Sequence, residues 1–269
     1  MDKYQVLYIM TGQIPLILGD SHGNQMSKYF GAYASKWEDK VNRALEVVSN
    51  GKVQAEFILL NEKSDFFCIN PVDNSCAINP CFHEQFKERL KCWSRCYVMM
   101  DGNIHNAHFA AIGEGGRKPF DIYMDEFPDK ILMGRQIVPK FVVENIFLRY
   151  SEYIFSKLVL ITKLLPEIPV AFVSPPPPVF LNELIKLNWN MFDTGEYEVN
   201  DPFVRLKMYT LYTKFLEECC RRANFVWLPA PKEAIDPQGF LWEKYCVDAT
   251  HAHPDYYELV ELQMDAVLK

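Results

Sequence analysis

Five short, largely apolar runs alternate along this chain with longer stretches of helical periodicity. The runs lie at 14–18, 54–60, 97–100, 168–173 and 225–228. Short apolar runs bounded by turn residues are typical of strands that are buried on both faces. Because strands that alternate with helices form parallel sheets covered on both sides, the sequence predicts an α/β fold. We expect a three-layer α/β/α sandwich around a five-stranded parallel sheet.

The stretches between these runs predict the helices and loops. Apolar residues recur at spacings of three and four, and Asp201-Pro202 is a favourable start for a helix. Prolines and small polar residues predict a loop over 61–80. The helices are expected at 25–48, 81–93, 140–165, 180–189 and 201–222, with a final one after Pro254.

Length and local composition bear on the domain organisation. A chain of 269 residues can form one α/β domain, so we expect a single domain over 1–269. The segment 108–137 contains several glycines and prolines and little periodicity. Long irregular segments in compact domains are often functional. This segment is therefore interpreted either as a lid over the site or as a structural insertion.

Charge and cysteine content argue against several classes of protein. The net charge is −7 and the pI is near 5.5, whereas nucleic-acid and acidic membrane surfaces favour basic partners. No apolar run is long enough to span a membrane, and the first ten residues do not resemble a signal peptide. The eight cysteines show no regular framework and are interpreted as reduced thiols. We expect a cytoplasmic protein that binds neither nucleic acid nor membrane.

The first apolar run ends abruptly in a polar turn, Gly19-Asp20-Ser21. This places Ser21 after the carboxyl end of a strand and before a helix, where free backbone N–H groups can stabilise a developing negative charge. A serine in this position can act as a nucleophile. It can equally be a helix cap, and this stretch alone leaves both interpretations open.

Two further polar turns follow apolar runs or lie downstream of them. One contains Gly102-Asn103, and the other contains Asp248 and His251. The spacing of three allows the Asp248 carboxylate to hold one ring nitrogen of His251, so that the other can accept a proton from a hydroxyl. Taken singly, Asp248 is equally a helix-capping residue and His251 a surface histidine. Because ligands bind beyond the carboxyl ends of strands in open α/β sheets, we expect the three turns to converge.

The ordered set of turns resembles the sequence blocks of the SGNH (GDSL-type) hydrolases. The matching segments are Gly19-Asp20-Ser21, Gly102-Asn103 and Asp248-x-x-His251, in the family's order. Additional patches are similar to a bacterial-type branch of that superfamily: 102–106, 119–121, the proline run 175–178 and 248–252. The resemblance spans nearly the whole chain. It implies a fold with the strand order of flavodoxin.

The resemblance also implies a role for each matching residue. Ser21 would be the nucleophile, His251 the general base and then acid, and Asp248 the residue that orients His251. The side-chain amide of Asn103 and the backbone N–H of Ser21 would form the oxyanion hole. The family's second block supplies a further glycine N–H, but no glycine of this chain matches that block clearly, so this donor is not assigned.

Other histidines gather near the same turns. His22, His105 and His253 are interpreted as residues that bind substrate oxygens or support the loops. Imidazoles close to Asp20 or Asp248 could bind zinc, but no metalloprotease-type histidine signature is present. We therefore expect no metal and no organic cofactor.

The sequence as a whole predicts a serine esterase that cleaves an O-acyl group from a small molecule or a carbohydrate. Two alternatives stay open: an acyltransferase that uses the same residues, and a binding module that kept the fold without the chemistry. The sequence does not specify the acyl chain, the alcohol or the oligomeric state.

Overall fold

Six strands form the central sheet of the protein. The computed structural model describes residues 14–20, 26, 46–49, 54–60, 66–70, 75–112, 119–188 and 197–267. The sheet order is β12-β10-β6-β1-β3-β2, and all neighbours are parallel except β2 and β3. The strands are β1 (Ile14–Gly19), β2 (Glu46–Ser49), β3 (Gln54–Leu59), β6 (Trp93–Met99), β10 (Val170–Val173) and β12 (Val226–Leu228).

The five parallel strands confirm the predicted sheet. Numbered along the chain, β1, β3, β6, β10 and β12 lie in the spatial order 2-1-3-4-5, which is the order of flavodoxin. The direction in which successive strands are added to the sheet reverses at β1, which has β3 on one side and β6 on the other. In open sheets of this kind, ligands bind beyond the carboxyl ends of the strands at such a reversal, which here are the ends of β1 and β6.

The prediction of a helix over 25–48 is wrong at its C-terminal end. Glu46–Ser49 form β2, an antiparallel edge strand in which Val47 pairs with Glu56 and Val48 with Ala55. Valine has a higher propensity for strands than for helices, and pairing with β3 stabilises the strand here. Met26 is helical, whereas the other residues of 25–45 lie outside the described part of the chain.

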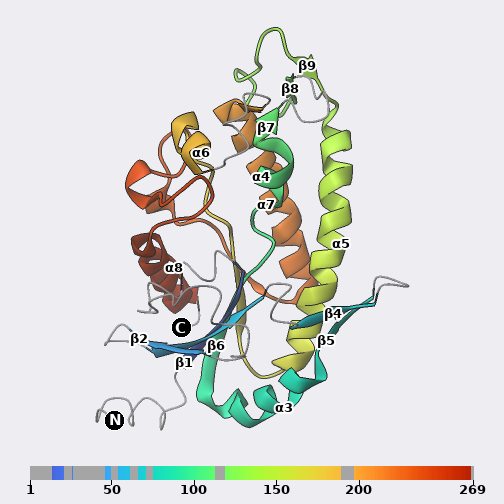
Figure 1. Cartoon of the computed structure of the whole chain (residues 1–269), viewed down its shortest axis with the longest axis vertical. Coiled ribbons are helices and arrows are strands. Elements are labelled where there is room, and N and C mark those ends of the chain that lie inside the picture. Colours follow the sequence, from blue (N-terminus) through green and yellow to red (C-terminus); the bar gives the residue numbers. More distant parts are fainter. Residues whose placement is uncertain are drawn as a thin grey trace.

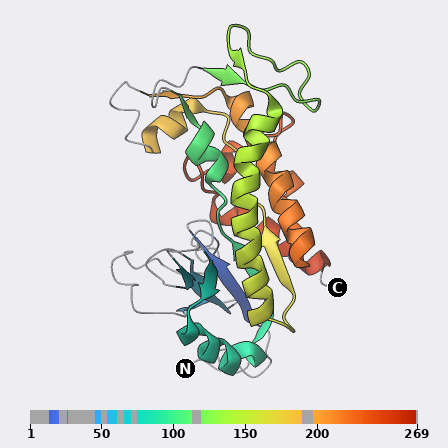
Figure 2. The ribbon, with the colours of Figure 1, turned by 90° about the vertical axis from the view of Figure 1, so that its right-hand side faces the viewer.

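Side chains of the strands alternate between two hydrophobic cores. Leu16, Leu18 and Phe172 pack into one core with residues of α5 (Lys140–Leu164) and α7 (Pro202–Ala223). Ile17 and Ala171 pack into the other with α8 (Pro254–Val267). Figures 1 and 2 show α5 and α7 side by side and α8 apart from them. The alternation is the two-residue period of a strand, and it produces the expected three layers.

The loop expected at 61–80 contains a hairpin. β4 (Phe67–Ile69) and β5 (Cys76–Ile78) pair in antiparallel fashion. Phe66 is completely buried beside Phe82 and Phe86, with ring centroids 4.9 and 5.9 Å away. These aromatic contacts anchor the segment. The polar composition of 61–80 does not predict them.

The following helix is shorter than predicted. α3 (Pro80–Arg89) and a 3₁₀ turn (Leu90–Cys92) precede β6, which begins at Trp93 rather than at Tyr97. Trp93 is 3% exposed and packs edge-on against Phe86 at 4.8 Å. The spacing of Trp93 predicts that it ends the helix, but its side chain is buried as the first residue of the strand β6.

The described parts of the 108–137 segment contain short paired strands, and one buried ion pair links the segment to α7. β7 (Ala111–Ile112) pairs with β11 (Glu198–Val199), and β8 (Phe120–Asp121) pairs with β9 (Gln136–Ile137). Lys207 of α7 donates to Asp121 Oδ1 at 2.7 Å, and both side chains are fully buried. This ion pair fixes the described part of the segment to α7. Other helical segments in the described ranges are α4 (Ile104–Phe109), α6 (Asn182–Asn188) and the 3₁₀ turns Lys232–Ala234 and Glu243–Tyr245.

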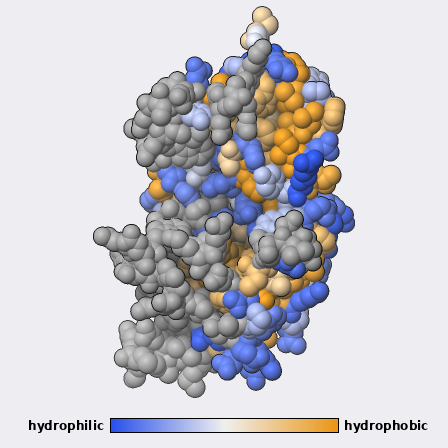
Figure 3. Space-filling model, turned by 45° about the vertical axis from the view of Figure 1, so that its right-hand side comes forward, coloured by the Kyte–Doolittle hydropathy of each residue, from blue (hydrophilic) through white to orange (hydrophobic). Residues whose placement is uncertain are grey.

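The surface around the start of α5 carries exposed apolar side chains. They include Phe141, Val142 and Leu148, and Figure 3 shows apolar residues gathered in the upper half of the face on which α5 comes forward. Within the described ranges, no helix has the length and hydropathy needed to cross a membrane. Among the described cysteines, the free thiols include Cys76, Cys92, Cys96, Cys219, Cys220 and Cys246.

Candidate active site

Three strands of the sheet are each followed by polar residues. Asp20 follows β1, Asp101-Gly102-Asn103 follow β6, and Ser174 follows β10. Of these residues, the sequence predicts only Asn103 as part of the site. Since these strands are parallel neighbours, the residues lie at the same edge of the sheet. Ser21 and His22 lie outside the described residues.

Asp248 and His251 are brought together in one tight turn. The His251 ring nitrogen Nδ1 lies 2.7 Å from Asp248 Oδ2, and the backbone N–H of His251 donates to Oδ1 at 2.9 Å. The backbone N–H of Thr250 donates to Oδ1 at 2.8 Å. The carboxylate therefore orients the imidazole through Nδ1 and makes no contact with Nε2.

The turn itself is fixed to its surroundings by main-chain hydrogen bonds. The Val247 N–H donates to the His251 carbonyl at 3.0 Å, and the His253 N–H donates to the Tyr245 carbonyl at 2.7 Å. Ala252, between the two histidines, is fully buried. This support limits the movement of the His251 ring.

The surroundings of Asp248 stabilise its charged form. Burial raises the pKa of Asp248, but the hydrogen bonds from the His251 ring and the Thr250 N–H and the charge of His251 together outweigh burial. The pKa of Asp248 falls to about 2. Asp248 is consequently a carboxylate at neutral pH, as a partner of an imidazole must be.

The turn after β6 contains a residue in the left-handed backbone region. Asp101 has φ of +56°, which costs energy for a residue with a Cβ, although Asp tolerates it better than most. Lys157 of α5 donates to Asp101 Oδ2 at 2.8 Å, and the Tyr212 hydroxyl donates to its carbonyl at 2.6 Å. The Asp101 N–H donates to Asp20 Oδ2 at 2.9 Å. These contacts hold Gly102 and Asn103 and link the turns after β1 and β6.

Asn103 directly precedes α4 but its side chain does not cap that helix. Its Oδ1 is buried and has no hydrogen-bond partner among the described residues. An asparagine at this position normally accepts from the second or third N–H of the helix. The side chain of Asn103 is therefore not used to cap α4.

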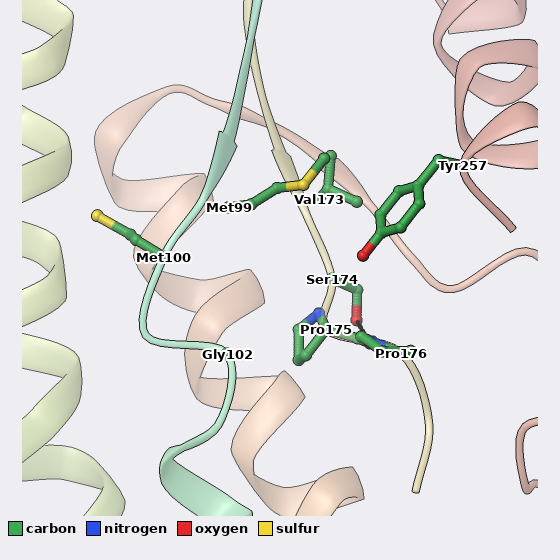
Figure 4. Close-up of a pocket in the computed structure, with 8 residues that line it drawn as sticks. All are labelled: Met99, Met100, Gly102, Val173, Ser174, Pro175, Pro176 and Tyr257. Atoms are coloured by element: carbon green, nitrogen blue, oxygen red, sulfur yellow. Dashed lines mark hydrogen bonds between the residues drawn. The ribbon is translucent and has the colours of Figure 1, made fainter. Parts of the chain in front are cut away.

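A small hollow lies beyond the ends of β6 and β10. Figure 4 shows Tyr257 of α8 directed toward Ser174 across this hollow, with Met99, Val173 and two prolines around it. The space holds about one water molecule. The residues that line it are Met99, Met100, Gly102, Val173, Ser174, Pro175, Pro176 and Tyr257.

Tyr257 shares the hollow with Gly102, which belongs to the turn after β6. Burial raises the pKa of Tyr257, and the negative charges of Asp20 and Asp248 raise it further. Tyr257 is not among the residues that the sequence predicts for the site, because a buried hydroxyl in a helix leaves no pattern in the sequence.

The two predicted binding histidines that the structure describes lie in different environments. His105 is 2% exposed and packs between Tyr209 and Tyr212, with ring centroids 5.4 and 5.8 Å away. Burial lowers the pKa of His105 to about 3, so the ring is neutral at physiological pH. The His253 side chain is 45% exposed and lies 3.4 Å from Asp255. In the described part of the chain, no group of three potential ligand side chains could hold a metal ion.

Several solved structures are similar to this chain at low sequence identity. No family model matches the sequence, and no curated protein matches it. The periplasmic domain of a lipopolysaccharide acetyltransferase from Salmonella ser. Paratyphi A gives a TM-score of 0.45 at 12% identity, covering 100% of this chain and 90% of that chain. A GDSL-like lipase from Bacteroides thetaiotaomicron gives 0.43 at 10%, covering 98% and 95%. An aryl esterase from M. smegmatis gives 0.40 at 12%, covering 95% and 98%. One of the three carries the name of the family that the motifs resemble.

Proposed function

We propose that the protein is a serine esterase of the SGNH type. It would cleave an O-acyl group from a small molecule or a carbohydrate through an acyl-enzyme on Ser21. The roles are those implied by the motifs: Ser21 as nucleophile, His251 as base and acid, Asp248 as its orienting partner, and Asn103 as an oxyanion donor. No cofactor is needed for this chemistry.

The observation that carries the proposal is the Asp248–His251 pair. A carboxylate 2.7 Å from Nδ1 fixes the tautomer in which Nε2 accepts a proton, and it stabilises the imidazolium that then forms. Asn103 lies at the same edge of the sheet and does not cap α4, and its side-chain N–H₂ would be the hydrogen-bond donor that acyl transfer requires.

The reaction then follows in two halves. In the first, Ser21 Oγ attacks the ester carbonyl as His251 Nε2 takes its proton, and Asn103 and the Ser21 N–H bind the oxyanion. The C–O bond to the alcohol breaks, and His251 returns the proton to the leaving alcohol. In the second, water attacks the acyl-enzyme with His251 again as base, which releases the acid and free Ser21.

Hydrolysis of p-nitrophenyl acetate tests the proposal. The wild-type protein is expected to release p-nitrophenol, and Ser21→Ala and His251→Ala should each lose at least about 1,000-fold in kcat. Hydrolysis should survive prolonged treatment with a chelator. If Ser21→Ala keeps wild-type activity, the proposal is wrong. A product mixture that shifts from acetate to an acetylated sugar, when a sugar is added, would instead identify an acyltransferase.

A further inference from the structure

Thr250 lies between Asp248 and His251 in the chain, and its side chain contacts both of them. The hydroxyl oxygen Oγ1 lies 3.3 Å from Asp248 Oδ1 and 3.2 Å from His251 Nδ1. The backbone N–H of Thr250 also donates to Asp248 Oδ1, at 2.8 Å. In the motif Asp248-x-x-His251, Thr250 occupies a position that the motif leaves open, so the motif assigns no role to this hydroxyl.

The distances around the His251 ring indicate where each hydrogen lies. Nδ1 is 2.7 Å from Oδ2 and 2.9 Å from Oδ1 of a carboxylate that is charged at neutral pH, so Nδ1 carries a proton and is a donor. A hydroxyl has one hydrogen, and a protonated Nδ1 cannot accept it. The hydrogen of the Thr250 hydroxyl is therefore donated to Asp248 Oδ1, and a lone pair of the same oxygen faces the Nδ1–H.

The two oxygens of the Asp248 carboxylate have different partners. Oδ1 accepts the backbone N–H groups of Thr250 and His251, at 2.8 and 2.9 Å, and also the Thr250 hydroxyl. Oδ2 lies closest to the ring nitrogen of His251, at 2.7 Å. The last torsion of an aspartate side chain is soft, and the donors gathered on Oδ1 restrict it. The carboxylate is thereby held with Oδ2 directed at the imidazole.

We propose that Thr250 is a positioning residue for the Asp248–His251 pair. Its hydroxyl bridges the two side chains, since it donates to the carboxylate and accepts from the imidazole N–H, and it keeps the ring in one orientation while Nε2 takes up and returns a proton. Thr250 acts only through these two side chains and is assigned no contact with the substrate. This inference rests on the proposed esterase function, in which His251 is the base.

Two substitutions at Thr250 separate its hydroxyl from the rest of the side chain. Thr250→Val keeps the shape and removes the hydroxyl, whereas Thr250→Ser keeps the hydroxyl. With p-nitrophenyl acetate, Thr250→Val should lower kcat roughly 5- to 20-fold with KM within about 2-fold of wild type, because both hydroxyl contacts are longer than 3 Å and one such bond has a modest net effect. Thr250→Ser should retain kcat to within about 3-fold.

Thr213→Val is the matched control. It removes a half-buried hydroxyl that donates to the Tyr209 carbonyl at 3.0 Å, in α7, which contributes no residue to the pair. This variant should keep kcat within about 2-fold of wild type. Thermal unfolding of all three variants should stay within a few degrees of the wild-type Tm. Equal losses of kcat in Thr250→Val and Thr213→Val, or failure of Thr250→Val to fold where Thr250→Ser is fully active, would overturn the inference.

A double-mutant cycle and an NMR signal test whether Thr250 acts through the pair. In an Asp248→Ala background, Thr250→Val should cost no more than about 2-fold in kcat, because the carboxylate that the hydroxyl contacts is absent. The His251 Nδ1–H proton should be observable in wild type and Thr250→Ser and should exchange with solvent faster in Thr250→Val.

These outcomes also separate the inference from the esterase function. Additive losses in the cycle, an unchanged kcat in Thr250→Val, or equal exchange of the Nδ1–H in wild type and Thr250→Val would overturn the positioning role alone. A wild type without any hydrolysis would contradict the esterase function, and the NMR comparison then decides whether the hydroxyl orients the ring.

Discussion

The Asp248 carboxylate contacts both the backbone and the ring of His251. Oδ1 accepts the backbone N–H of His251 at 2.9 Å, while the ring nitrogen Nδ1 lies 2.7 Å from Oδ2 and 2.9 Å from Oδ1. The first contact fixes the turn and the second fixes the ring. A single side chain therefore couples the local backbone to the orientation of the proposed base.

Asp248→Asn should separate these two functions. The amide oxygen can still accept the backbone N–H, but the carboxamide cannot stabilise an imidazolium and favours the wrong tautomer. We expect kcat for p-nitrophenyl acetate to fall about 1,000- to 10,000-fold with the fold intact by circular dichroism. A variant with more than a tenth of wild-type kcat would show that Asp248 only caps the turn.

The depressed pKa of Asp248 predicts a pH dependence of stability. Its pKa is about 2 in the folded protein and 3.8 in an ordinary aspartate, so its contribution is fully present above about pH 4 and is lost as pH falls toward 2. Since the side chain is 25% exposed, solvent screening reduces the contribution to roughly 1–2 kcal/mol. Urea unfolding of wild type and Asp248→Asn should show that difference at pH 6 and almost none at pH 2. A difference that is constant over this range would contradict the assignment.

The left-handed backbone of Asp101 predicts different effects of two small substitutions. Asp101→Gly and Asp101→Ala both remove the ion pair with Lys157, but only glycine adopts a φ of +56° without strain. Asp101→Ala should therefore be less stable than Asp101→Gly by about 1 kcal/mol in urea unfolding. Equal stability of the two would mean that the turn relaxes to another conformation.

The buried ion pair between Lys207 and Asp121 predicts a large loss of stability when one partner is removed. Lys207→Met leaves a buried carboxylate without its cation and should cost about 3–5 kcal/mol. Lys214→Met is the matched control on the same helix, because Lys214 pairs with Glu126 at the surface and should change stability by less than about 1 kcal/mol. Similar losses in the two variants would show that the pair does not anchor the 119–138 segment to α7.

The parallel strands could be predicted because their burial on both faces gives continuous apolar runs. Ile17 and Leu18 point into different cores, yet both must be apolar, and the same holds for the strands beside them. The edge strand at Glu46–Ser49 could not be predicted in this way. Its residues continue the helical spacing of the preceding segment, and only their pairing with β3 makes them a strand. The 67–78 hairpin was missed because Phe66 gains its burial from a helix that follows it in the sequence.

The part of the site that could be predicted is the part in which two side chains meet because they lie only a few positions apart in the sequence. The contact between Asp248 and His251 requires three positions of separation and nothing else from the fold. The support of Asp101 could not be predicted, because Lys157 and Tyr212 lie on helices 56 and 111 positions away and neither belongs to a recognisable motif. The hollow beside Tyr257 is formed by two strand ends and a helix, and only the packed structure reveals it.

Labelling with a fluorophosphonate probe tests the central claim most directly. Peptide mass spectrometry of the wild-type protein should place the phosphonyl group on Ser21, and His251→Ala should slow the labelling strongly because the hydroxyl loses its base. Ser21→Ala should neither take up the probe nor hydrolyse p-nitrophenyl acetate. A probe attached at another residue, or a Ser21→Ala protein that is still labelled and active, would contradict the assignment of this chain as a serine esterase that acts through Ser21.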